Sequence, residues 1–170
     1  TSTEMLKGFI LSRFDSSNDR EKANAFWKKA IKSLHDHSSN KEEDQQFIQA
    51  WLRSQYAQTI RQSKAGSANE DFENIGTRFH NWFRDNLPKI GLTPDESLGF
   101  KTLLHEEMSF YLRAYQDILE AQKEETEGLE HVFYTKHWGI AASLSFPLML
   151  APLKSSDSQE AAHQKINLVA

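Results

Sequence analysis

The stretch of sequence that decides the fold reads FKTLLHEEMSFYLRAYQDI and runs from residue 100 to residue 118. Its large apolar side chains follow one another at steps of four, four, three, four and three. They are Phe100, Leu104, Met108, Tyr111, Tyr115 and Ile118. This spacing places them on one face of an α-helix, which has about 3.6 residues per turn. We expect one long helix that continues to about Gln122, roughly 40 Å in length.

The same periodicity recurs on both sides of this helix. Apolar residues at helical spacing occupy residues 5–14, 23–34, 47–60, 72–83 and 162–169, and a nearly uncharged apolar segment covers 140–153. Several helix starts are marked by capping residues. These are Thr1 with Glu4, Asn18 with Glu21, Thr93 with Glu96, and Ser156. Gly66 is a natural stop for the third helix.

These signals predict an all-α protein, a single-core bundle of six or seven helices. One segment is ambiguous, because residues 129–135 fit either a short strand or a helical turn. Six aromatic residues at helical spacing are more typical of a core than of a ligand pocket. They are Trp51, Tyr56, Phe79, Trp82, Tyr111 and Tyr115.

The composition fits one domain. The chain has 170 residues, of which 38% are hydrophobic and 26% are charged, and its net charge is -4. It has no cysteine, which excludes a disulfide framework, a thiol nucleophile and a cysteine-ligated zinc site. No apolar run approaches the ~20 residues of a membrane span. We expect a cytoplasmic protein with no membrane partner.

The two ends of the sequence coincide with helix boundaries. The first residues are a helix cap, so that the first helix starts near residue 3, and the last helix reaches residue 170 without a stop signal. We expect residues 1–170 to form one helical domain, a fragment of a longer multidomain protein.

Motifs that carry chemistry are missing from the sequence. It has no Gly-rich phosphate loop, no Gly-x-Ser-x-Gly elbow and no His-Glu-x-x-His pair, since Ser109 stands where a second histidine would follow His105. His35 and His37 lie near Asp36 and Asp44, but a solvated loop explains them better than a metal site. We predict no catalytic residue, no metal and no cofactor, and therefore no enzyme activity for this chain.

One local concentration of positive charge stands out against the acidic average. Arg20, Lys22, Lys28, Lys29 and Lys32 crowd the second predicted helix. Such a face can meet the phosphates of a nucleic acid. A solvated helix face is the more common meaning of this pattern.

Several phrases of the sequence resemble a known family. They are Thr3-Glu-Met-Leu-Lys-Gly-Phe-Ile-Leu-Ser12, Ala25-Phe-Trp-Lys28, the stretch from Phe47 to Tyr56, Phe72-Glu-Asn-Ile-Gly76, Tyr111-Leu-Arg-Ala-Tyr115, Gly128-Leu-Glu-His-Val-Phe-Tyr134 and Phe146-Pro-Leu-Met-Leu-Ala-Pro-Leu153. In this order they resemble the helical region that follows the ParB-like N-terminal domain in GmrSD-type restriction endonucleases. The resemblance covers essentially the whole chain, and its motifs are packing motifs.

The resemblance implies a place in prokaryotic defence. Members of that family restrict modified phage DNA. Nucleotide hydrolysis is attributed to the N-terminal domain with its Asp-Gly-Gln-Gln-Arg motif, and DNA cutting to a His-Asn-His nuclease domain. Neither motif occurs here, so no catalytic residue can be assigned from the family. The implied role is a non-catalytic helical scaffold that couples the neighbouring domains of its own chain, with any DNA contact made through the parent protein.

Two other functions stay open at this point. The first is a nucleic-acid-binding module that uses the basic helix over residues 20–32. The second is a free-standing protein-interaction domain, which predicts an exposed apolar patch around residues 140–153.

Overall fold

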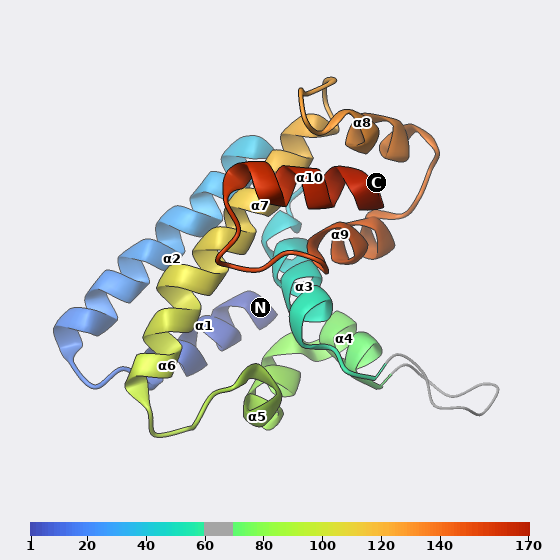
Figure 1. Ribbon diagram of the computed structural model, residues 1–170. Helices are drawn as coiled ribbons and strands as arrows, with labels where there is room; N and C mark the ends of the chain where they lie inside the picture. Colours follow the sequence, from blue (N-terminus) through green and yellow to red (C-terminus); the bar gives the residue numbers. More distant parts are fainter. Residues whose placement is uncertain (60–69) are drawn as a thin grey trace.

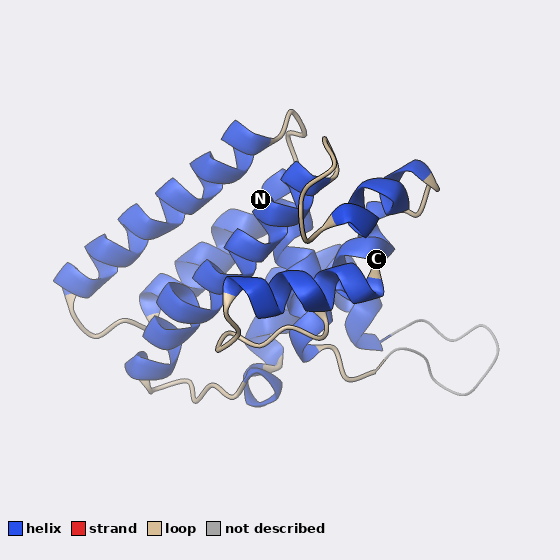
Figure 2. Ribbon diagram, turned by 45° about the horizontal axis from the view of Figure 1, so that its top comes forward, coloured by secondary structure: helices blue, strands red, loops and turns tan. Residues whose placement is uncertain are grey.

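The structure is a computed structural model, and it describes residues 1–59 and 70–170. All regular secondary structure in these residues is helical (Figures 1 and 2). The elements in chain order are α1 (Ser2–Ser12), α2 (Ser17–His37), α3 (Glu43–Tyr56), α4 (Glu70–Asp85), α5 (Leu87–Ile90), α6 (Ser97–Thr102), η1 (Leu103–Met108), α7 (Ser109–Ala121), α8 (Glu130–His137), α9 (Ala142–Leu150) and α10 (Gln159–Val169). The all-α prediction is confirmed for the described residues.

The long helix expected from the deciding stretch is confirmed. The elements α6, η1 and α7 form one continuous run from residue 97 to residue 121, and the six apolar residues that predicted it are buried. Its middle part, η1, is π-helical, which the sequence did not predict. The cap predicted at Thr93 is wrong, because the helix begins at Ser97. Thr93 accepts a turn hydrogen bond from Glu96 N at 3.1 Å, and the extended Glu96 precedes α6.

The core is one cluster of buried side chains built around α3. Figure 1 shows α2 running alongside α7, while α3 crosses the centre of the molecule. Helix α3 contacts α1, α2, α4, α7 and α9. Aromatic side chains fill this space, and Trp27, Phe47, Trp51 and Phe83 are fully buried. The aromatic residues predicted to be core are buried as well, except Tyr56, which is partly buried.

The number of helices differs from the prediction. The described residues form nine helices when the continuous run is counted once, instead of six or seven. The difference arises where Pro88 and Gly91 delimit the short helix α5, and beyond residue 122, where the chain forms three separate helices. Gly91 has a φ of 77°, a left-handed conformation that glycine adopts without strain.

Residues 129–135 were ambiguous between a strand and a helical turn, and they lie in or next to the helix α8. Two other predicted helix caps are wrong. The side chains that cap α2 and α10 are Ser16 and Ser158, where the sequence pointed to Asn18 and Ser156. In each case the side chain of the serine immediately before the helix accepts a hydrogen bond from the backbone N–H three residues on. Helix α3 ends at Tyr56, while Ile60 and Gly66 lie outside the described residues.

Candidate interaction surface

The exposed half of α9 is the most unusual surface of the described residues. The segment from Trp138 to Leu153 contains no charged residue. One face of α9 packs into the core through Phe146, Met149 and Leu150. The other face carries Leu144 and Leu148, which are 52% and 60% exposed. A helix that is apolar on all sides is normally buried all round, so this free face indicates a contact surface.

The chain that leads into α9 adds more apolar surface. Trp138 is 82% exposed and Ile140 is 48% exposed. Gly139, with a φ of 76°, lets the chain turn between them. The interaction patch predicted around residues 140–153 is therefore partly exposed. Only the inner face of α9 is buried.

A groove runs beside Leu144 and Leu148. It has a volume of about 380 Å³ and separates α9 from the end of α3 and the start of α4. We call it the α9 groove. Its lining is mostly apolar and consists of Arg53, Ser54, Ala57, Phe72, Leu144, Pro147, Leu148 and Ala151. Arg53 is the charged residue of this lining.

Arg53 lies half-buried at the inner edge of the α9 groove. Its Nε donates a hydrogen bond to the carbonyl of Phe72 at 3.0 Å, and its guanidinium carbon lies 3.9 Å from the centroid of the Phe72 ring. Burial lowers the pKa of the guanidinium, and the negative charge of Glu73 acts against this. An arginine remains charged under these conditions because its ordinary pKa is above about 12.

A smaller cavity of about 110 Å³ lies on the other side of Arg53, between α3 and α9. Its polar lining includes Gln46, Gln49, Arg53 and Ser143. Gln49 is fixed there by donating from Nε2 to the carbonyl of Gly76 at 3.2 Å. Arg53 therefore lines both this smaller cavity and the α9 groove.

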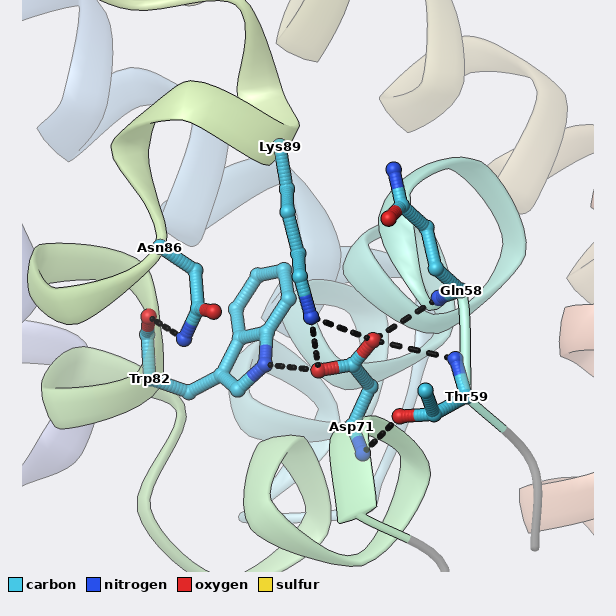
Figure 3. Close-up of polar contacts among 6 residues, drawn as sticks. All are labelled: Gln58, Thr59, Asp71, Trp82, Asn86 and Lys89. Carbon is cyan, nitrogen blue, oxygen red and sulfur yellow. Dashed lines mark hydrogen bonds and ion pairs between the residues drawn. The ribbon is translucent and has the colours of Figure 1, made fainter.

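The start of α4 is held in place by Asp71 (Figure 3). The carboxylate accepts hydrogen bonds from Trp82 Nε1 at 2.9 Å, from Lys89 Nζ at 2.9 and 3.0 Å, and from the backbone N–H groups of Gln58 and Thr59 at 2.8 and 3.1 Å. The Asp71 backbone N–H in turn donates to Thr59 Oγ1 at 3.1 Å. These bonds tie the end of α3, the start of α4 and α5 together, and so fix the neighbouring Phe72 beneath Arg53.

Asp71 is charged in the folded protein although it is only 4% exposed. Burial by itself raises the pKa of the carboxyl. The hydrogen bonds from Trp82, Lys89 and the two backbone amides outweigh burial and hold the pKa well below its usual range. With both oxygens bonded to donors of its own chain, Asp71 acts as a structural clamp.

A second buried carboxylate, Glu43, bridges α3 to α7. Glu43 is 4% exposed and accepts hydrogen bonds from the hydroxyl groups of Tyr115 and of Ser38, the latter at 2.7 Å. Burial, and then the bond to Glu43, raise the pKa of the Tyr115 hydroxyl. These contacts join residues far apart in the sequence and fix the two helices against each other.

The basic residues singled out from the sequence lie on α2. All five are exposed. Arg20 Nη2 donates to the carbonyl of Phe14 at 3.1 Å, and Lys32 pairs with Asp36 at 2.7 Å. Lys22, Lys28 and Lys29 make no ion pair with any residue that the structure describes.

The histidines weighed from the sequence do not converge. His35 Nε2 lies 3.9 Å from Asp44, while His37 Nδ1 contacts the carbonyl of Ser33 at 2.8 Å. His105 is exposed, with its ring against Phe26. Residues 1–59 and 70–170 contain no group of three or more His, Cys, Asp or Glu that fits a metal ion.

Sequence reasoning missed Arg53, Asp71 and Glu43. Each is a charged residue within a helical pattern, where a solvated position is the usual outcome. The one available signal was the position of Arg53 inside the apolar stretch from Phe47 to Tyr56.

Comparison with known protein families, curated proteins and solved structures gives no match. The fold and surface of the described residues define the class as an all-helical domain with an exposed apolar face on α9. Within the described ranges, no helix is both long and apolar enough to pass through a bilayer.

Proposed function

We propose that this chain is a non-catalytic helical scaffold that holds a neighbouring protein surface against α9. The observation that carries the proposal is the exposure of Leu144 and Leu148 on a helix without charged residues. Keeping two leucines one helical turn apart in water is unfavourable, by about 25 cal/mol for each Å² of apolar surface. Covering them with a second protein surface removes this penalty.

The parent that we propose is a defence protein of the GmrSD type. The support is the resemblance of residues 3–12 and 146–153 to the helical region of that family, together with the helical fold. In such a parent the neighbouring surfaces belong to the ParB-like and nuclease domains. The scaffold passes the state of one domain to the other as a shift of packed helices.

The contacts favour α9 over the polar linker after it as the coupling element. The linker is fastened at both ends. Lys154 N donates to Asp157 Oδ2 at 2.9 Å, Lys165 Nζ pairs with Asp157 at 2.8 Å, and Ser155 Oγ donates to Glu107 at 2.7 Å. A free hinge would lack such bonds, whereas α9 offers an open face.

The first test is to read the frame on both sides of this segment in the source gene. We expect an Asp-Gly-Gln-Gln-Arg motif upstream and a His-Asn-His nuclease downstream. A start codon immediately before Thr1 and a stop codon after Ala170 would overturn the scaffold proposal in favour of a free-standing interaction domain.

The second test measures whether α9 is covered in the full-length protein. The chain has no cysteine, so Leu148→Cys places one thiol at the proposed contact. We expect this thiol to react with a maleimide quickly in the 170-residue chain and far more slowly in the full-length protein, with the reacted peptide identified by mass spectrometry. Leu98→Cys is the matched control, because Leu98 is 75% exposed on α6. Equal reactivity at position 148 in both proteins would refute docking at α9.

A second candidate function is nucleic-acid contact through α2. The observation that favours it is the set of exposed lysines, Lys22, Lys28 and Lys29, that make no ion pair with the described residues. Exposed lysines without an acidic partner bind phosphates readily.

A further inference from the structure

Arg53 has hydrogen-bonding capacity that the described residues do not use. A guanidinium carries five N–H donors, and one of them, on Nε, is bonded to the carbonyl of Phe72. The two Nη groups make no hydrogen bond and no ion pair with any described residue. Glu73 affects the charge of Arg53 only through space. Arg53 therefore has N–H donors that a ligand can use.

Lys89, the other partly buried cation of this region, has a carboxylate partner. Lys89 is bonded to both oxygens of Asp71. Lys89 is thus paired with a carboxylate, whereas the Nη groups of Arg53 have no partner among the described residues. Arg53 lines both the α9 groove and the smaller cavity.

The wall opposite Arg53 is apolar and helical. Leu144 and Leu148 are spaced by one turn of α9 and project beside the groove, with Phe72 and Ala57 on the other side. A ridge of this kind accepts a second helix whose own apolar residues are spaced by three or four. Residues 138–153 are uncharged, and Arg53 is the charged residue in the groove lining that a helix seated here meets.

We propose that the α9 groove binds an amphipathic helix of a neighbouring domain, and that a glutamate or aspartate of this helix pairs with Arg53. The inference rests on the proposed scaffold function and names the chemistry of its partner. The carboxylate takes two parallel hydrogen bonds from the guanidinium, a geometry that arginine provides and lysine does not. The apolar side of the helix covers Leu144 and Leu148.

The test uses two synthetic helical peptides and the 170-residue chain. Both peptides present two leucines one turn apart, followed one turn later by glutamate in the first peptide and by glutamine in the second. Dissociation constants are measured by calorimetry, and the NMR signal of the Arg53 Nε–H group reports where the peptide binds. We expect the glutamate peptide to bind about tenfold more tightly, the difference typical of one charge-assisted hydrogen-bonded pair.

Variants assign this preference to Arg53. Arg53→Gln removes the preference for glutamate, and Arg53→Lys reduces it because the bidentate geometry is lost. Arg113→Gln is the matched control, since Arg113 is an exposed arginine on α7 and its loss leaves the preference unchanged. Circular dichroism of each variant shows whether the fold is kept. If Arg53→Gln does not fold, Arg53→Lys and Gly76→Ala, which shifts the guanidinium, provide the same comparison.

Three results would overturn the proposal. They are equal affinity of the two peptides for the unmodified chain, an unchanged preference in Arg53→Gln, and no binding of either peptide. Binding of octanoate with the same dependence on Arg53, in the absence of peptide binding, would assign the groove to a free amphiphile instead. The two proposals can fail separately. Equal affinity of the two peptides would refute the pairing with Arg53 but not docking at α9. A thiol at position 148 that reacts equally fast in the full-length protein would refute docking at α9.

Discussion

The guanidinium of Arg53 occupies the space that a side chain on Gly76 would need. A Cβ atom built on Gly76 meets Nη2 of Arg53 well inside van der Waals contact. The absence of a side chain at Gly76 thus lets Arg53 lie across α4, with its Nε bonded to the carbonyl of Phe72. The direction in which Arg53 points is set by a residue on another helix.

Gly76→Ala tests this relationship. Alanine in a helix is favoured over glycine by up to about 1 kcal/mol. Here we expect that gain to be offset, because the guanidinium must leave the Phe72 ring and carbonyl. The measurements are the free energy of unfolding in urea and the NMR signal of the Arg53 Nε–H group.

Gly8→Ala is the matched control for this substitution. Gly8 lies within α1, and a Cβ atom there has no atom within 4 Å. We expect Gly8→Ala to stabilise the protein by about 0.5 to 1 kcal/mol. Equal stabilisation by both substitutions, with the Arg53 signal unmoved, would show that Gly76 does not constrain Arg53.

Asp71→Asn is expected to destabilise the protein by about 3 kcal/mol at neutral pH, since it leaves partly buried Lys89 and the N–H donors around Asp71 without their charged partner. The pKa of Asp71 is lower in the folded state than the ordinary value of about 3.9. The contribution of its charge is therefore complete above about pH 4 and is lost as the pH falls further. Urea unfolding of both proteins at neutral and acidic pH measures it.

Asp85→Asn is the comparison for Asp71→Asn. Asp85 pairs with Arg84 at 3.2 Å on the surface of α4, with its side chain 62% exposed. We expect little change in stability from it, because exposed ion pairs contribute little. A difference between wild type and Asp71→Asn that stayed constant into acid would contradict the role given to the charge of Asp71.

Tyr115→Phe is expected to cost about 1 to 3 kcal/mol, because buried Glu43 loses a hydrogen-bond donor. The pKa of Tyr115 is raised by burial and by Glu43, so the folded protein keeps this hydroxyl protonated. The unfolded chain ionises it above about pH 10, and stability falls as the pH rises beyond that value. Burial raises the pKa of Tyr56 and Tyr111 in the same direction.

The measurement for Tyr115 is urea unfolding at neutral and alkaline pH. We expect the loss of stability in alkali to be smaller in Tyr115→Phe than in the unmodified protein, since one of the buried hydroxyls is gone. Tyr134→Phe, at a half-exposed position on α8, is the control and should leave stability nearly unchanged. An alkaline loss identical in Tyr115→Phe and wild type would contradict the argument.

Charge reversal on α2 decides between scaffold and nucleic-acid contact. If the lysines bind phosphates, Lys22→Glu, Lys28→Glu and Lys29→Glu together abolish DNA binding, and the binding of the unmodified chain falls steeply as salt increases. Fluorescence anisotropy with duplex DNA over a salt series measures both effects. If the scaffold proposal alone is right, the chain has no salt-sensitive affinity for the substitutions to remove.

The helices of this protein could be predicted because the relevant signal is local. Phe100, Leu104 and Met108 recur with the period of a helix, and the side chains that follow this period are buried. Boundaries were less predictable, because several serines and threonines compete as caps and tertiary packing selects among them. Ser97, for example, is buried, and its hydroxyl accepts a hydrogen bond from Asp15 N at 3.4 Å.

The amino-acid sequence by itself determined the all-helical class, the aromatic core and the uncharged apolar segment before residue 154, since each depends on composition and short-range spacing. Only the tertiary structure decided that one face of this segment stays exposed and that Asp71 and Glu43 are clamps. It also decided that Arg53 reaches the groove with unused donors. These properties depend on which groups meet across the core, such as Glu43 and Tyr115 from α3 and α7. Helical periodicity fixes which face of a helix turns inward, but not which partner that face meets.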